Sequence, residues 1–272
     1  MTIQALLSEF GMKLNFTVVV LTVALMAARI IPVLALTPFL GGETTPTEVK
    51  IGLSLALAVI LFPVVQERIS NVPIAAIPYI ALLLKELFIG VALAFIVEMV
   101  FEAARAAGHL VDTAAGAAMA QVMVPQLQQQ VTIFSSLKFQ LSVVLFLTLN
   151  GHHVVIQALG DSFLTLPLDQ FPAFSAGRWA FFDLIGRVFG HLLLVAVMLS
   201  APALIATFLT DLALGMINRV APQIQVFFIS MSVKPVVAAA VVLLSAHLLL
   251  ERMQVEFRTM LERLATAIRL LA

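Results

Sequence analysis

Residues 211–235, DLALGMINRVAPQIQVFFISMSVKP, place a polar cluster between two long apolar segments. Pro222 and Pro235 lie within this stretch. A charge at the centre of a bilayer costs about 2.5–3.5 kcal/mol on insertion scales. The stretch therefore predicts a segment surrounded by protein or water rather than by lipid alone. Its polar members are Asp211, Asn218, Arg219, Gln223, Gln225, Ser230, Ser232 and Lys234.

The composition of the whole chain defines its class. Of the 272 residues, 62% are hydrophobic and 11% are charged, whereas soluble domains have roughly 45–50% apolar and about 25% charged residues. The chain is therefore an integral membrane protein. A net charge of zero gives no basic bias toward nucleic acid. The absence of cysteine excludes disulfides, thiolate catalysis and cysteine metal sites.

The hydrophobic pattern predicts an all-α, multi-helix protein in a single membrane domain, residues 1–272. A spanning helix needs about 20 apolar residues. Segments 73–103 and 180–217 exceed this length, so each is either one tilted, projecting helix or a broken helix or hairpin. Residues 251–272 alternate charged and apolar groups at helical spacing and predict an amphipathic helix. The candidate spans are 14–40, 49–66, 73–103, 131–159, 180–217 and 222–250.

Many charges lie within or beside apolar segments. Glu98, Glu102 and Arg105 share one helix face, and Arg105, His109 and Asp112 continue it; Asp211 and Arg219 are two turns apart. We interpret these either as ion pairs that fix helix register or as groups that move ions or substrate. The full set is Arg29, Lys85, Arg105, Lys138, Arg187, Arg219 and Lys234, with Glu86, Glu98, Glu102, Asp112, Asp183 and Asp211.

Two further segments have unusual composition. Residues 104–130 are rich in alanine and end in glutamines, which predicts a helix followed by a loop in a polar or protein environment. Asn150 and Gly151 form a strong turn pair, so His152 and His153 are expected at the polar end of a helical hairpin. Because HExxH, GxSxG and P-loop motifs do not occur, the sequence predicts neither an enzyme nor a cofactor or metal site.

Three stretches together resemble the FliR family of flagellar export-gate proteins and its virulence counterpart, the SctT family. They are LFLTLNGHHVVIQALGDSFLTLP at 145–167, residues 211–235, and EAARAAGHLVDTAAGAAMAQVMVP at 102–125. LNGHH is more similar to the flagellar branch, and SMSVKP to the virulence branch. The resemblance implies long, kinked helical hairpins in the bacterial inner membrane, at the base of a flagellar or injectisome basal body.

The same resemblance implies partners. The subunit would join FliP-like and FliQ-like subunits in a helical gate that admits unfolded export substrates, with an FlhB-like switch protein around its cytoplasmic side. It also implies a plug within residues 114–130, for which the candidate residues are Ala115, Gly116, Met119, Met123 and Pro125. The alternative is a small-residue helix packed closely on a neighbour.

The resemblance also suggests an arrangement for residues 211–235. Pro222 would separate two antiparallel helices, with the hairpin tip at 218–225, and Asp211 and Arg219 would pair within the subunit or across it. The competing function is a secondary transporter with broken helices, in which an internal repeat is often found. The two halves of the chain show no convincing repeat.

Overall fold

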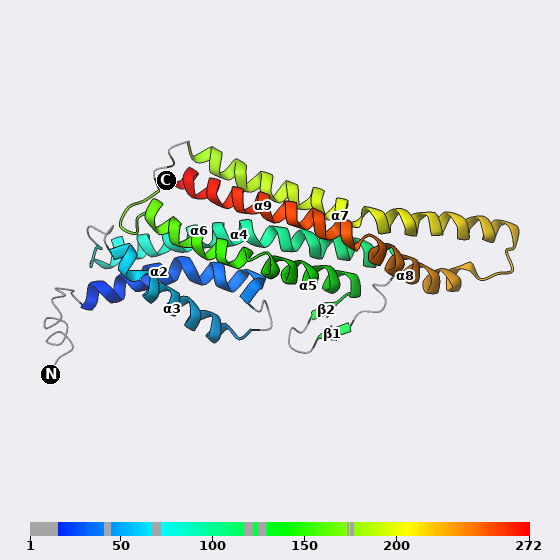
Figure 1. Ribbon diagram of the computed structural model, residues 1–272, viewed down its shortest axis with the longest axis horizontal. Coiled ribbons are helices and arrows are strands. Elements are labelled where there is room, and N and C mark those ends of the chain that lie inside the picture. The colour runs from blue at the N-terminus through cyan, green and yellow to red at the C-terminus, as the bar shows by residue number, and fades with distance from the viewer. Residues whose placement is uncertain are drawn as a thin grey trace. The chain divides into compact units, whose positions relative to one another are not determined.

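The computed structural model describes residues 16–40, 45–66, 72–116, 122–124, 129–172, 174 and 177–272 (Figure 1). The described chain is almost entirely helical, which confirms the all-α prediction. Its elements are α2 (Phe16–Leu36), the 3-10 turn η1 (Pro38–Leu40), α3 (Thr47–Gln66), α4 (Ala76–Ala114), β1 (Val122–Val124), β2 (Gln129–Val131), α5 (Ile133–Thr148), α6 (Gly151–Thr165), α7 (Arg178–Val220), α8 (Val226–Leu244) and α9 (Ala246–Leu271).

Five of these helices are long and apolar enough to cross a membrane, and the bent pair α5–α6 could form a sixth crossing. Helices α4 and α7 have 39 and 43 residues. At a rise of 1.5 Å per residue they are about 58 and 64 Å long, roughly twice the thickness of the hydrocarbon layer. Both are continuous, so the structure favours long projecting helices over the alternative of a hairpin within each segment.

The chain divides into two compact units, each built from separated parts of the sequence. Unit 1 comprises residues 1–97, 153–184 and 262–272, and unit 2 comprises residues 98–152 and 185–261. In unit 1 the core includes Leu25, Ile30 and Val33 of α2, all buried. In unit 2 the rings of Phe101, Phe146 and Phe257 pack with centroids 5.0–5.5 Å apart. The prediction of a single domain over residues 1–272 stays a prediction.

Residues 131–159 do not form one span. Helix α5 ends at Thr148 and α6 begins at Gly151, and the chain is bent by 70° between them. Asn150 has φ 57°, in the left-handed region that asparagine tolerates better than most residues. The chain therefore bends at this position, and the hairpin end predicted at Asn150, Gly151, His152 and His153 stays a prediction.

A short β-ribbon interrupts the helices between α4 and α5. Strands β1 and β2 pair antiparallel, with Val122 opposite Val131 and Val124 opposite Gln129. The sequence prediction had only a loop in this region. Each strand contains β-branched valine, which favours extended backbone. The ribbon is therefore an addition to the predicted all-helical fold.

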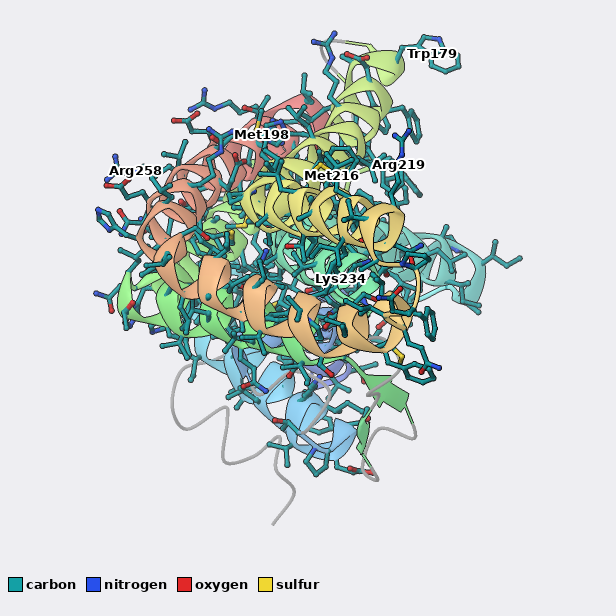
Figure 2. All side chains as sticks on the ribbon, turned by 90° about the vertical axis from the view of Figure 1, so that its right-hand side faces the viewer. Trp179, Met198, Met216, Arg219, Lys234 and Arg258 are labelled. Carbon is teal, nitrogen blue, oxygen red and sulfur yellow. The ribbon has the colours of Figure 1, made fainter. Side chains whose placement is uncertain are left out.

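The predicted hairpin of residues 211–235 is present. Helix α7 ends at Val220 and α8 begins at Val226, so the turn occupies residues 221–225 and includes Pro222. In Figure 2, which faces the hairpin tip, Lys234 lies between the two helices while Met216 and Arg219 lie on α7. The helices are thus held side by side by contacts between their facing sides.

Helix α9 is the predicted amphipathic helix. Met253, Phe257 and Met260 are buried, as are Leu264 and Ile268 further along. Its other face carries charged residues that are mostly exposed, such as Arg258. The spacing of three and four residues between apolar positions therefore predicted the buried face correctly.

Candidate functional site: charged caps on a broken helix

The largest completely buried side chain of unit 1 is a charged one, Arg29 of α2. Its Nε donates to Glu86 Oε2 at 2.5 Å. Its two terminal nitrogens donate to the carbonyls of Ser162 at 2.8 Å and Leu166 at 3.0 Å, and the guanidinium lies 4.4 Å from the ring centroid of Phe163. Arg29 therefore connects three helices and occupies the C-terminal end of α6.

Lys85 of α4 holds the residues that follow α6. Its ammonium donates to the carbonyls of Pro167, Leu168 and Gln170 at 3.0–3.1 Å. It also lies 2.5 Å from Glu86 Oε1. The three N–H donors of lysine are thus surrounded by four oxygens, so the chain leaving α6 is fixed in a non-helical path by one ammonium group.

We define Arg29, Lys85 and Glu86 as the cationic clamp. Its two cations and one carboxylate leave an excess positive charge among these three buried residues. The C-terminus of a helix carries a partial negative charge of roughly half an electron, on carbonyls that lack intrahelical donors. The clamp therefore places its excess positive charge at the end of α6, where the helix dipole favours a cation.

Close packing of α2 on α4 makes the clamp possible. A Cβ atom added to Gly90 would collide with the carbonyl of Arg29. Gly90 is one helical turn beyond Glu86 on α4, so the two helices meet closest beside the ion pair. A larger residue here would separate α2 from α4 and pull Arg29 away from Glu86.

Unit 2 contains the complementary arrangement at the N-terminus of α5. Asp112 of α4 is buried, and its two oxygens accept hydrogen bonds from the backbone N–H groups of Phe134 at 3.1 Å and Ser135 at 2.9 Å. Thr132, at the N-cap position, makes no side-chain capping bond. Asp112 therefore supplies, from another helix, the acceptor that a local cap residue usually provides.

A glycine again allows the approach. A Cβ atom added to Gly108 would collide with the backbone of Ser135. Gly108 precedes Asp112 by one turn, so the small residue and the carboxylate lie on the same face of α4. The start of α5 can therefore lie against the backbone of α4, within reach of Asp112.

The charged residues predicted on one face of α4 make several separate contacts. Arg105 pairs with Glu102 at 3.1 Å, and its guanidinium lies 4.0 Å from the ring centroid of Phe139. Glu98 is half-buried. Asp112 caps α5, and Thr132 Oγ1 lies 3.3 Å from His109 Nδ1. These residues fix α4 against α5, which favours the structural interpretation over a pathway for ions.

The charge pair of the α7–α8 hairpin differs from the prediction. Asp211 pairs with Lys234 across the hairpin at 2.6 Å, and Arg219 is exposed in the last turn of α7. Two positions eight residues apart are separated by about 12 Å along a helix, too far for an Asp211–Arg219 contact within one subunit. Arg219 lies instead where the C-terminal dipole of α7 favours a cation.

The comparisons with known proteins now identify the family. The model of bacterial export proteins, family 1, matches residues 20–260. The chain belongs to this family of bacterial export proteins.

Its relatives include members from two kinds of apparatus. The flagellar biosynthetic protein FliR of Bacillus subtilis is 32% identical, over 72% of this chain and 75% of its own length. The Yop proteins translocation protein T of Yersinia pestis is 30% identical, over 77% of both chains. The secretion system apparatus protein SsaT of Salmonella typhimurium is 28% identical, over 75% of this chain and 78% of its own.

The candidate plug residues of this family member are only partly within the described structure. Ala115 is buried and packs with Val111 and Phe134 in a core that also contains Ala203, Ala238 and Val242. Gly116 follows α4 with φ 69°, the conformation common after a helix C-terminus. Met123 belongs to β1, while Met119 and Pro125 lie outside the described residues.

The remaining candidates, His152 and His153, lie in the first turn of α6. His152 is half-buried and His153 is exposed near the start of α6. Within the described ranges, no three histidine, aspartate or glutamate side chains are placed to bind a metal ion. Three buried charges of this export protein, Arg29, Lys85 and Asp112, contact the backbone at or beside helix ends.

Proposed function

We propose that this chain is a pore-forming structural subunit of the type III protein export gate in the bacterial inner membrane. The observation that carries this proposal is the family match over residues 20–260. Relatives named for flagellar biosynthesis and for protein translocation support it from both branches. The flagellar gate is our first candidate, and the virulence gate is the alternative.

The exposed surface supports assembly into a larger complex. Large apolar side chains are exposed along α3, α7 and α8, including Ile60, Phe208 and Phe227. Such a surface must contact lipid or other subunits. We propose FliP-like and FliQ-like gate subunits as its protein partners, an FlhB-like switch protein beside them, and unfolded export substrates in transit. The proposal includes no nucleic acid and no cofactor.

The assembly can be tested by native mass spectrometry. The chain is expressed alone and together with FliP-like and FliQ-like subunits, and each product is weighed in detergent. A mixed assembly that contains this chain is expected. A monodisperse particle that ignores both partners would contradict the gate and would favour the competing transporter, for which substrate uptake is the next assay.

We further propose that the segment between α4 and α5 closes the channel. Its two ends are held in unit 2, one by the burial of Ala115 and the other by the bonds from Phe134 and Ser135 to Asp112. The antiparallel ribbon brings residues 122–124 next to 129–131. These two anchors attach the ends of the segment to unit 2, as a seal that stays joined to its subunit requires.

A deletion tests the seal. Removing residues 117–120 spares Ala115 and the ribbon strands, and we expect it to raise the permeability of the assembled gate to small ions. Removing four residues elsewhere, 41–44, is the control and should leave the permeability unchanged. Equal permeability of both deletion variants and the parent gate would contradict a sealing role.

A further inference from the structure

Helix α7 contains a proline in its middle. Pro202 has no N–H group, so the carbonyl of Met198, four residues earlier, loses its intrahelical donor. The proline ring also opens the turn that precedes it, which is a common cause of a helix kink. Figure 1 shows α7 changing direction partway along its length, where its colour passes from yellow-green to yellow.

A lysine from another helix reaches this same turn. Lys138 of α5 is 2% exposed, and its ammonium donates to the carbonyl of Leu199 at 2.9 Å. In a straight helix each carbonyl points along the axis toward the N–H group of the next turn. Leu199 follows Met198 in the turn that the proline opens, so an ammonium can approach its carbonyl from the side more easily than in a straight helix.

Burying the ammonium of Lys138 costs desolvation free energy, which its contact with the turn before Pro202 must offset. Among the residues that the structure describes, the carbonyl of Leu199 is its hydrogen-bond acceptor, and Asp112 attracts it electrostatically. Burial of a cation with one acceptor is unfavourable compared with an apolar side chain of similar size. A methionine would fill the space, but it could not donate a hydrogen bond to the opened turn.

We propose that Lys138 and Pro202 form a clasped hinge: the proline opens the turn, and the ammonium holds it in one bent geometry. The clasp fixes the direction of the second half of α7 relative to α5. Ala203, the next residue, packs in one core with Phe134 of α5 and Ala115. The hinge and the anchor of the segment between α4 and α5 therefore belong to the same packed cluster of unit 2.

The hinge can be measured directly in the full chain. Because the sequence has no cysteine, Leu194→Cys and Leu212→Cys can carry a pair of spin labels, and both positions are half-exposed. They are 18 residues apart, which is five turns, so the labels share one face of α7 and would be about 27 Å apart on a straight helix. The clasped hinge predicts one narrow distance distribution that differs from this value.

Two lysine variants distinguish the loss of the Lys138 contact from the general effect of replacing a buried lysine. Lys138→Met should broaden the distribution, because the opened turn loses the group that fixes it. Lys50→Met is the matched control, since Lys50 is a buried lysine of unit 1 that also donates to a single backbone carbonyl, that of Ala35 at 2.9 Å. It should leave the distribution unchanged. An unchanged distribution in Lys138→Met would overturn the proposal.

A double mutant keeps the test valid even if Lys138→Met does not fold. Pro202→Ala restores the missing N–H, should move the distance toward the straight-helix value, and leaves Lys138 without its opened turn. The proposal predicts that Lys138→Met combined with Pro202→Ala has a higher apparent Tm than Pro202→Ala alone. A double mutant that is less stable than Pro202→Ala would overturn it. Neither measurement needs partner subunits or export, so failure here leaves the proposed function unaffected.

Discussion

Neutralising Glu86 is the sharpest test of the cationic clamp. Its carboxylate accepts from Arg29 and lies against Lys85, and the side chains of Glu86 and Arg29 are fully buried. Glu86→Gln would leave two cations together in an apolar interior. Breaking a buried pair in this way costs about 3–5 kcal/mol. With roughly 2–4 °C per kcal/mol for a protein of this size, we expect the apparent Tm to fall by about 6–20 °C.

The assay is thermal unfolding of the purified chain in one detergent, followed by circular dichroism. Glu102→Gln is the matched control, because Glu102 pairs with Arg105 on the same helix but is about one-third exposed. Pairs that are open to solvent contribute about 0.2–1 kcal/mol, so the control should shift the apparent Tm by no more than about 4 °C. Equal shifts in the two variants would refute the clamp as a buried, energetically important network.

A triple variant separates the two roles of the clamp, which are the pairing of its three charges and the donation of hydrogen bonds to backbone carbonyls. Replacing Arg29, Lys85 and Glu86 together by methionine removes every charge of the clamp, which would be neutral or stabilising if the residues only paired with one another. The carbonyls of Ser162, Leu166 and the residues that follow would lose donors, however, and each buried unsatisfied acceptor costs about 1–3 kcal/mol. We therefore expect the triple variant to remain less stable than the parent chain.

Five further substitutions test the same geometry, each measured as the change in unfolding free energy of the purified chain. Asp112→Ala should cost about 1–3 kcal/mol, because two buried N–H groups of α5 lose their acceptor; no loss would contradict the cap. Lys234→Ala should cost up to about 1 kcal/mol and Arg219→Ala less; the reverse order would restore the pairing predicted from the sequence. Gly108→Ala should destabilise the chain, whereas Gly190→Ala, where a Cβ meets open space, should stabilise it by up to about 1 kcal/mol.

The class of the fold could be predicted from composition because the bilayer restricts the possible structures. Backbone polar groups in hydrocarbon must bond within the segment, so long apolar runs become helices. The amphipathic face of α9 was predictable for the same local reason, since residues such as Met253 and Phe257 repeat at helical spacing. These predictions use information contained within about twenty consecutive residues.

The partners of the buried charges could not be predicted in this way. Arg29 was recognised as a charge in an apolar segment, but its contacts lie 57 residues away at Glu86 and 133 residues away at Ser162. Helical spacing reports only neighbours on the same helix. It placed Asp211 and Arg219 on one side of a helix, and it could not show that Lys234 on the next helix, also a charge-pair candidate, is the partner of Asp211. The adjacent pair Lys85 and Glu86, one turn before a glycine, was the signal available in the sequence.

Three of the charges that lie in apolar segments, Asp112, Arg29 and Lys85, have a common physical role. A helix that begins and ends inside a protein exposes N–H groups at its start and carbonyls at its end. Neither set can be left without hydrogen-bond partners in an apolar environment. Asp112 places an anion at the N-terminus of α5, and Arg29 and Lys85 place cations at the C-terminal end of α6. Each sign matches the helix dipole at its end. An ion pathway would need charges that change partners, whereas Asp112 is held by two backbone N–H groups, which favours a fixed anchor for the segment between α4 and α5.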